Sequence, residues 1–330
     1  VVAGITPFNF PLNLVAHKVG PGLAGGNAVI VKPDTKTPLS ALWLARAIHD
    51  AGIPPGVLQV ITGPGREIGD LLVTDPRVCM ISFTGGLSTG EAIMRKMGLK
   101  KVGMELGSNC PVIVMEDADL EQAVEANVSG AFWAAGQNCL HVQRLIVQDG
   151  IYNAFKQRFV DAAAAYRVGD KLDEATDMGP LINETAAKNV ENMVNEAVAA
   201  GATVLTGGTR EGAFYDPTVL ENVPDSVPLA CEEIYGPVTV LYRFSELEEA
   251  IERANEVNYG LQAGIFTRDV QTAFRAAARL ECGGVMINDS TDYRIDAMPF
   301  GGVKGSGLGR EGIKFALQEM TEPKLVCFNL

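Results

Sequence analysis

The first hundred residues alternate short apolar runs with segments whose apolar residues recur at helical spacing. The apolar runs predict strands, and the periodic segments predict helices. Strands are expected at Val1–Ile5, Asn27–Val31, Val57–Ile61 and Met80–Phe83. Helices are expected at Leu39–Ala51, Glu67–Leu72 and Gly90–Met97. This alternation predicts an α/β protein with a doubly wound, mostly parallel sheet.

After about residue 108 the alternation continues with longer helices. The expected helices are Leu120–Ala134, Ile151–Tyr166, Thr185–Ala200, Phe244–Ala254 and Val270–Leu280. The expected strands are Pro111–Met115, Arg144–Gln148, Val204–Thr206, Thr239–Phe244 and Gly284–Asn288. A glycine-rich segment, Pro299–Gly312, precedes a last helix and an apolar tail, Lys324–Leu330. The apolar pattern of the tail predicts an exposed strand, and such strands usually pair with a partner.

Composition narrows the class of protein. The chain has 330 residues, of which 47% are hydrophobic and 20% charged, as in a globular protein of about two domains. A formal net charge of -13 argues against a nucleic-acid partner. No apolar run reaches the roughly 18–20 residues of a membrane span, and no signal peptide is visible. Because the chain starts at Val1 inside a strand pattern, we expect a fragment that lacks an N-terminal segment.

The cysteines and histidines indicate neither a disulfide framework nor a metal site. The six cysteines contain no C-x-x-C pair, and the three histidines are scattered. A reducing, cytoplasmic setting is therefore expected, without a metal.

Glu105 and Cys139 are the first candidate catalytic residues. Glu105 lies in GMELGSNCP and Cys139 in AAGQNCLHVQR. A carboxylate that can act as a base and a thiol that can act as a nucleophile are the minimum for covalent chemistry at a carbonyl. Taken alone the pair is weak evidence, because most cysteines are inert buried side chains.

Three further motifs follow predicted strands, each with a structural alternative. Thr84, Gly85 and Gly86 of FTGG could approach a phosphate or simply form a tight turn. Lys32 could reach a ribose hydroxyl or phosphate, or be a solvated surface lysine. Asn9 in TPFNFP could stabilise an oxyanion or cap the following helix.

The order of these motifs along the chain is more specific than any one of them alone. TPFNFP, KPDTKTP, FTGG, MELG, GQNC, EEIYGPV and PFGGVKGSGLGRE follow one another with spacings that resemble the aldehyde dehydrogenase superfamily over essentially all 330 residues. Within it, the chain looks closest to the branch of non-phosphorylating glyceraldehyde-3-phosphate and semialdehyde dehydrogenases. The resemblance implies a Rossmann-like NAD(P)-binding domain over 1–107, a catalytic domain over 108–310, and a C-terminal helix and oligomerisation strand over 311–330.

The resemblance also implies a role for individual residues. Cys139 would attack the aldehyde carbon, and Asn9 with the Cys139 N–H would stabilise the oxyanion. Hydride transfer to a nicotinamide cofactor would leave a thioester that Glu105-activated water hydrolyses to a free acid. Lys18 and Glu311 match positions that relay protons to this base. The residues expected to bind cofactor are Lys32, Thr35, Thr84, Gly85, Gly86, Glu233 and Tyr235.

Three positions depart from the family's pattern or stand apart from its motifs. Thr35, followed by Lys36, occupies a position where relatives often carry an acidic residue that repels a 2′-phosphate, so NADP, or both NADP and NAD, is the expected cofactor. Asn138 stands where relatives that use phosphorylated substrates often have arginine. Arg294 could anchor a substrate carboxylate or form an ion pair with Asp292 or Asp296.

The leading hypothesis is an NAD(P)-dependent aldehyde dehydrogenase that acts on a small aldehyde as a homodimer or homotetramer, with no nucleic-acid or membrane partner. Two alternatives remain open at this point, an inactive fragment and a non-catalytic structural relative. The sequence does not identify the aldehyde.

Overall fold

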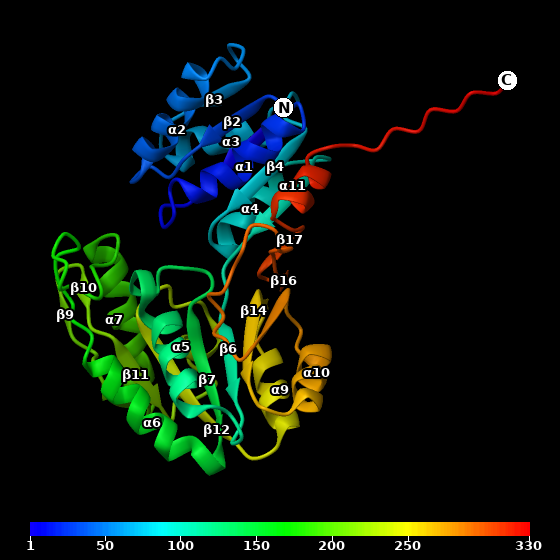
Figure 1. Ribbon diagram of the computed structural model, residues 1–330. Coiled ribbons are helices and arrows are strands. Elements are labelled where there is room, and N and C mark those ends of the chain that lie inside the picture. Colours follow the sequence, from blue (N-terminus) through cyan, green and yellow to red (C-terminus); the bar gives the residue numbers. More distant parts are fainter. The chain divides into compact units, whose positions relative to one another are not determined.

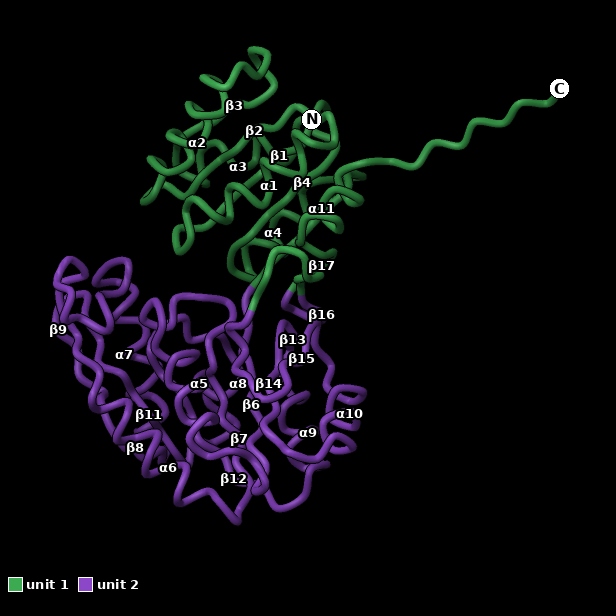
Figure 2. The backbone as a smooth tube through the Cα atoms, in the orientation of Figure 1, with its two compact units in different colours: residues 1–106, 294–301, 307–330 green, residues 107–293, 302–306 purple.

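The computed structural model describes residues 1–330, which divide into two compact units. Figure 2 colours them separately. Unit 1 comprises Val1–Leu106, Arg294–Gly301 and Gly307–Leu330, and unit 2 comprises Gly107–Tyr293 and Gly302–Ser306. The segment 311–330 belongs to unit 1.

Unit 1 is built on a six-stranded sheet with the order β17-β5-β4-β1-β2-β3. The strands are β1 (Val2–Ile5), β2 (Val29–Lys32), β3 (Leu58–Val60), β4 (Met80–Thr84), β5 (Lys101–Glu105) and β17 (Gly307–Leu308). Strands β1 to β5 are parallel, and β17 joins β5 in the antiparallel sense. The chain builds outward from β1 to β3 and then resumes on the other side at β4. This reversal is the topological switch point of a doubly wound sheet.

Five helices complete unit 1, and Figure 1 draws their ribbons in blue, cyan and red. They are α1 (Asn13–Ala24), α2 (Pro38–Asp50), α3 (Gly65–Thr74), α4 (Leu87–Lys96) and α11 (Ile313–Glu319). Helix α2 begins with Pro38, whose fixed backbone angle suits the first helical position. The core is apolar and tightly filled. Ala3, Val29, Val31 and Ile81 of the sheet are wholly buried.

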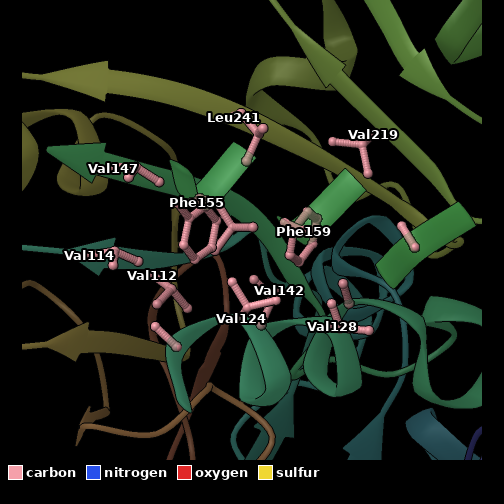
Figure 3. Packing of buried hydrophobic residues seen from close by; sticks show 14 of the residues in the cluster. Val112, Val114, Val124, Val128, Val142, Val147, Phe155, Phe159, Val219 and Leu241 are labelled. Atoms are coloured by element: carbon pink, nitrogen blue, oxygen red, sulfur yellow. The ribbon is translucent and has the colours of Figure 1, made fainter. Parts of the chain in front are cut away.

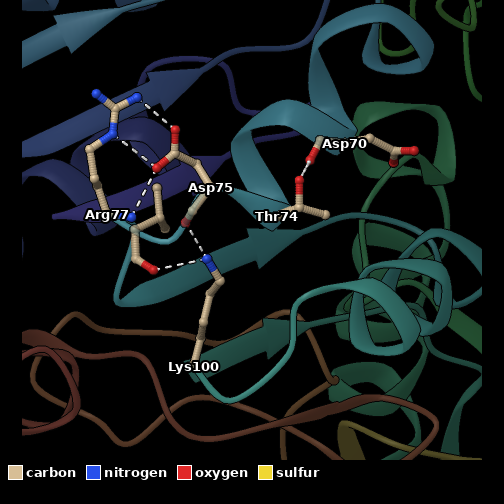
Figure 4. Close-up of polar contacts among 6 residues, drawn as sticks. Asp70, Thr74, Asp75, Arg77 and Lys100 are labelled. Atoms are coloured by element: carbon tan, nitrogen blue, oxygen red, sulfur yellow. Dashed lines mark hydrogen bonds and ion pairs between the residues drawn. The ribbon is translucent and has the colours of Figure 1, made fainter.

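A polar turn joins α3 to β4 (Figure 4). The Arg77 guanidinium donates to both Asp75 carboxylate oxygens, at 3.0 and 2.7 Å, which holds the pKa of that carboxyl well below its usual range. Lys100, which precedes β5, donates to the carbonyl oxygens of Val78 at 3.0 Å and of Asp75. Thr74 donates to the Asp70 carbonyl at 2.7 Å. These bonds satisfy backbone carbonyls at the end of α3 and fix the start of the neighbouring strands.

Unit 2 contains a seven-stranded sheet with the order β15-β14-β6-β7-β12-β11-β8. Its strands are β6 (Cys110–Val114), β7 (Val142–Gln148), β8 (Thr203–Thr206), β11 (Thr218–Glu221), β12 (Val238–Phe244), β14 (Gln262–Phe266) and β15 (Gly284–Ile287). Only β8 runs antiparallel to its neighbour. Two small antiparallel ribbons pair β9 (Arg210–Glu211) with β10 (Phe214–Tyr215) and β13 (Tyr259–Gly260) with β16 (Val303–Lys304).

The helices of unit 2 bury aromatic side chains against this sheet. They are α5 (Leu120–Phe132), the short 3₁₀ helix η1 (Trp133–Gly136), α6 (Asp149–Ala164), α7 (Glu184–Ala199), α8 (Pro228–Cys231), α9 (Leu247–Asn255) and α10 (Val270–Arg279). Phe155 and Phe159 of α6 are fully buried and stacked, with ring centroids 5.7 Å apart (Figure 3). Truncating one of these rings to alanine would cost about 3–5 kcal/mol of stability.

The predicted strands and helices are confirmed, with ends shifted by one to three residues, apart from the tail. Helices α1 and α8, strands β5, β11 and β14, and the two-residue strands β9, β10, β13, β16 and β17 were not predicted. Pro21 inside α1 and Gly103 inside β5 break the sequence patterns on which such predictions depend. Residues 322–330 form no strand within the chain, because they pair with no other backbone segment. No helix combines the length and apolar character that crossing a membrane requires.

Candidate active site

The carboxyl ends of the parallel strands in unit 1 gather several predicted site residues at one edge. Ile5, the last residue of β1, is in register with Lys32 at the end of β2 and with Phe83 on β4. Thr84 is in register with Glu105 at the end of β5. Ligands of doubly wound sheets bind at this edge, beside the switch point between β1 and β4.

Lys32 is a buried cation at this edge. Its side chain is 6% exposed and donates to the Pro33 carbonyl at 3.1 Å. Burial lowers the pKa of Lys32, with Asp34 acting in the opposite direction. A lysine held this way is not the solvated surface residue that the sequence left open. Thr35 and Lys36 are exposed, and the Lys36 ammonium lies 5.3 Å from the centre of the Phe8 ring.

The FTGG turn after β4 exposes backbone next to a helix. An added Cβ at Gly85 would lie 2.5 Å from the Phe83 ring, whereas Gly86 has open space beside it. Gly86 is the N-cap of α4, so unpaired N–H groups at the helix start follow it. The Thr84 hydroxyl is buried and has no hydrogen-bond partner. The turn therefore combines a spare polar group with room for a phosphate.

Asn9 lies in the turn between β1 and α1. The N-cap of α1 is Leu12 and receives no side-chain hydrogen bond, so Asn9 does not cap this helix. The Asn9 Oδ1 atom is buried without a hydrogen-bond partner. A buried amide oxygen without a partner costs stability, and the Asn9 Nδ2 atom is the end of the side chain able to donate to an oxyanion.

Glu105 ends β5 inside a small cavity of about 10 Å³, room for about one water molecule. The residue is 5% exposed, and its Oε2 atom has no hydrogen-bond partner. Burial and the neighbouring Glu311 raise the pKa of Glu105 well above its ordinary value, against the opposing charge of Lys18. A carboxyl held this way is a stronger base than an exposed glutamate.

A buried ion-pair network lines the same cavity. The Lys18 Nζ atom lies 3.0 Å from Glu311 Oε1 and 3.2 Å from the Ser82 hydroxyl. Arg294 reaches the other Glu311 oxygen at 3.2 Å and stacks 3.7 Å from the Phe300 ring centre. Burial opposes ionisation of Glu311, yet Lys18 and Arg294 hold its pKa below the ordinary value. Arg294 thus forms its ion pair with Glu311 instead of Asp292 or Asp296.

In unit 2, Cys139 follows a strained loop that precedes β7. Ala134, Ala135 and Gly136 all have positive φ angles, of 54°, 54° and 67°. An added Cβ at Gly136 would lie 2.1 Å from the Gly236 carbonyl oxygen. Such strain persists only where the surroundings impose it, and it clusters at functional sites. No disulfide joins any two of the six cysteines.

Ser108 connects the Cys139 loop to Glu233. Its hydroxyl donates to the Cys139 carbonyl, and its N–H donates to Glu233 Oε1 at 2.9 Å. Asn138 is buried, and its Oδ1 atom accepts from the Leu140 N–H at 2.9 Å. The Asn138 side chain is therefore used to shape its own loop. These contacts lie at the amino ends of β6 and β7.

Glu233 and Tyr235 follow α8 in the same region of unit 2. Burial raises the pKa of Glu233 to about 7, although the Ser108 N–H favours the ionised form. Its carboxyl closes over Gly107, where an added Cβ would lie 2.5 Å from Glu233 Oε2. Tyr235 has a positive φ of 53°. Burial first, and then the nearby Cys139 and Glu233, raise the pKa of its hydroxyl.

Sequence reasoning missed four residues that shape these sites: His17, Ser82, Gly107 and Ser108. Ser82 contacts Lys18, and His17 lines the cavity of Glu105. Gly107 and Ser108 stand in the GMELGSNCP segment that was quoted for Glu105, so their position beside a candidate base was the available signal. No sequence signal distinguished His17 or Ser82. No group of three or more His, Cys, Asp and Glu side chains is arranged to hold a metal ion.

Comparison with known proteins agrees with this fold. The aldehyde dehydrogenase family model matches residues 1–326. Aspartate-semialdehyde dehydrogenase 1 of Pseudomonas canavaninivorans is 56% identical over 100% of this chain and 70% of its own length. An aldehyde-dehydrogenase-like protein of Sinorhizobium fredii is 53% identical over 100% of this chain and 64% of its own length. The chain thus spans about two thirds of these relatives.

Solved structures of aldehyde dehydrogenases are also similar to this chain. The glyceraldehyde-3-phosphate dehydrogenase GapN of Methanocaldococcus jannaschii, complexed with NADP, is 46% identical with a TM-score of 0.94, over 97% of this chain and 70% of that one. The betaine aldehyde dehydrogenase of Staphylococcus aureus, in complex with NAD+, is 36% identical with a TM-score of 0.94, over 98% of this chain and 68% of that one. The chain belongs to the aldehyde dehydrogenase family.

Proposed function

We propose that this chain carries the catalytic machinery of an enzyme that oxidises a small aldehyde to a carboxylic acid with NADP or NAD. Family membership supports the reaction class. The observation that carries the proposal is Glu105, a buried carboxyl with an unpaired Oε2 atom beside a second buried carboxyl, Glu311. This arrangement costs stability, and perturbed carboxyls of this kind are typical of catalytic sites.

The residues present fit a nicotinamide dinucleotide. Unit 1 offers the buried Lys32 for the adenosine ribose, and the Gly86 turn at the start of α4 for the pyrophosphate. In unit 2, Glu233 is a buried carboxyl suited to hydrogen-bond the hydroxyls of the nicotinamide ribose. When bound, this cofactor accepts a hydride from the aldehyde carbon.

Cys139 forms the covalent bond in this mechanism. Its thiolate adds to the aldehyde carbon, and the carbonyl oxygen takes up the negative charge. The Asn9 amide and the Cys139 N–H donate hydrogen bonds to that oxygen. Loss of the hydride re-forms the carbonyl and leaves a thioester on the Cys139 sulfur.

Glu105 releases the product. Its carboxylate takes a proton from water, the hydroxide adds to the thioester carbon, and the C–S bond breaks. The products are a free carboxylic acid and the Cys139 thiolate. Lys18 and Glu311 line the cavity of Glu105, where their ion pair orders the water molecule that takes the proton from the Glu105 carboxyl and returns the base to its ionised form.

NADP is the proposed preferred cofactor. Thr35 is exposed beside Lys36 and carries no charge, and the Asp34 carboxylate before it accepts a hydrogen bond from the Lys36 N–H. At position 35 a 2′-phosphate therefore meets a hydroxyl next to an ammonium group instead of a carboxylate.

The substrate is proposed to be a small aldehyde, and the relatives define a panel. It contains aspartate semialdehyde, 3-sulfolactaldehyde, lactaldehyde and succinate semialdehyde, after relatives that are 42–56% identical. Asn138 and Arg294 remain proposed substrate contacts, although each side chain already has a partner within the chain. The Asn138 Oδ1 atom accepts a hydrogen bond from the Leu140 N–H, and Arg294 pairs with Glu311.

The apolar tail is proposed to pair with a second copy of the chain in a homodimer or homotetramer. Leu325 is 91% exposed and Phe328 is 80% exposed, although both are large and apolar. Such side chains favour an interface. Sedimentation of the chain with and without residues 324–330 tests this, and an unchanged assembly would exclude the tail. We also propose a cytoplasmic location.

The direct test of function follows cofactor reduction with each aldehyde of the panel and with NAD or NADP. Wild type should reduce the cofactor with at least one aldehyde, and Cys139→Ser should not. Cys231→Ser is the matched control, since this exposed cysteine lies outside the proposed mechanism. Aldehyde oxidation that survives in Cys139→Ser would refute the mechanism.

A further inference from the structure

Two cavities of unit 1 share one wall. The smaller, of about 10 Å³, is lined by Lys18, Glu105 and Glu311 among others. The larger, of about 230 Å³, lies along α1 and α11 and is lined mostly by apolar side chains. Only His17 and Ala316 line both cavities. Of these two residues, only the histidine can bind and release a proton.

The contacts of His17 give its two ring nitrogens different surroundings. The Nδ1 atom lies 3.5 Å from the Arg294 guanidinium, which also binds Glu311. The Nε2 atom is buried and lies 3.4 Å from an oxygen of Asp296, too long for a well-formed hydrogen bond. The Asp296 side chain is 64% exposed. One ring nitrogen thus faces the buried charge network, and the other faces an exposed carboxylate.

The surroundings of His17 favour its neutral form, which is the form able to accept a proton. Burial lowers its pKa, and Arg294 and Lys18 act in the same direction. Glu311 and Asp296 act in the opposite direction. These are the charged groups that face the ring.

We propose that His17 carries protons between the small cavity of Glu105 and the larger cavity along α1 and α11. This inference rests on the proposed function, in which Glu105 takes a proton from water in every turnover. Water in the small cavity passes that proton to His17 Nδ1, which becomes an imidazolium. The imidazolium then releases its Nε2 proton toward Asp296 and the solvent. Water-mediated transfer of the remaining proton from Nδ1 to Nε2 restores the starting tautomer, so no net charge accumulates.

The test uses p-nitrophenyl acetate, an ester whose acetyl group can be transferred to a reactive thiol. A burst of p-nitrophenolate reports acylation of Cys139, and the slower steady release reports hydrolysis that needs Glu105. His17→Gln should keep the burst and lower the hydrolysis rate by about 10-fold or more. Added imidazole should restore hydrolysis in His17→Ala, because a small base can occupy the vacated space. His49→Gln, which changes another histidine of unit 1, should leave both phases unchanged.

Hydrolysis that is unchanged in His17→Gln would overturn the inference. A loss that imidazole does not restore, and that lowers the burst equally, would show a structural role and overturn it as well. Absence of a burst in wild type would instead count against Cys139 as the nucleophile.

In that case an NMR titration of the His17 ring still tests whether this residue is coupled to the charge network beside Glu105. The chain has three histidines, so a His17→Gln spectrum assigns its signals. The His17 pKa should fall further in Glu311→Gln, because Glu311 raises it. A His17 pKa that Glu311→Gln leaves unchanged would overturn the inference, because His17 would then not sense the buried charge network.

Discussion

The Lys18 ammonium and the Glu311 carboxylate are 293 positions apart in the sequence, yet their Nζ and Oε1 atoms lie 3.0 Å apart inside unit 1. Both side chains are almost completely buried, at 1% and 9% exposed. The pair joins α1 to the segment before α11, and it is the charged neighbour of Glu105. It therefore connects the stability of the fold to the proposed chemistry.

Lys18→Met should destabilise the chain by about 3 kcal/mol, because it leaves Glu311 with Arg294 as its only remaining ion-pair partner in a buried site. Urea denaturation measures the change. Lys188→Met, which breaks the exposed Lys188–Glu184 pair, should cost less than about 1 kcal/mol. Equal losses in the two variants would contradict a structural role for the buried pair.

The Lys18→Met effect should depend on pH in a defined direction. The pKa of Glu311 is lowered in the folded chain, so its ionisation stabilises the fold above the ordinary carboxyl pKa. That contribution is lost as the pH falls through the folded pKa. The difference between wild type and Lys18→Met should therefore shrink on acidification, and a difference that grows would exclude this account.

Glu233→Gln should stabilise the chain in alkaline solution. The folded pKa of Glu233 is about 7, above its ordinary value, so its protonated form favours folding and the benefit is lost as the pH rises through about 7. A glutamine keeps the acceptor for the Ser108 N–H and has no charge to bury. Melting curves should agree near pH 4 to 5 and separate by up to about 3 kcal/mol above pH 8. A variant less stable than wild type above pH 8 would refute this.

The sequence predicted site residues where they stand in local motifs. Lys32, the Gly86 turn and Cys139 each belong to a short segment beside one strand, so their surroundings follow from nearby residues. His17 and Ser82 matter through contacts with Glu311 and Lys18 that only the folded chain creates. The ion-pair alternative for Arg294 named Asp292 and Asp296, which are close in sequence, whereas the partner that the fold brings close is Glu311.

Gly107→Ala should disturb Glu233. The new methyl group would lie 2.5 Å from the Glu233 carboxylate, which must move away from the Ser108 N–H. We expect weaker binding of NADP by calorimetry and a stability loss of about 1–3 kcal/mol. Gly69→Ala, in helix α3 with no atom within 4 Å of the new Cβ, should instead stabilise slightly. Unchanged NADP affinity in Gly107→Ala would contradict the proposed role of Glu233 in cofactor binding.

Thr35→Glu should shift cofactor preference toward NAD. A carboxylate at this exposed position would repel a 2′-phosphate and accept hydrogen bonds from a 2′-hydroxyl. The ratio of kcat/KM for NADP to that for NAD should fall by about 10-fold or more, since one close charge contact changes binding by about 1–2 kcal/mol. Thr35→Ser is the matched control and should keep the ratio. A wild-type chain that strongly prefers NAD would contradict the proposed preference for NADP.

Cys139 is proposed to form a thioester that water, activated by Glu105, then hydrolyses. Intact-mass measurement after mixing with p-nitrophenyl acetate, followed by peptide mapping, tests this most directly. One acetyl group should appear on Cys139, disappear with time in wild type, and persist in Glu105→Gln. An acetyl group on another residue, or one lost equally fast in Glu105→Gln, would contradict the claim.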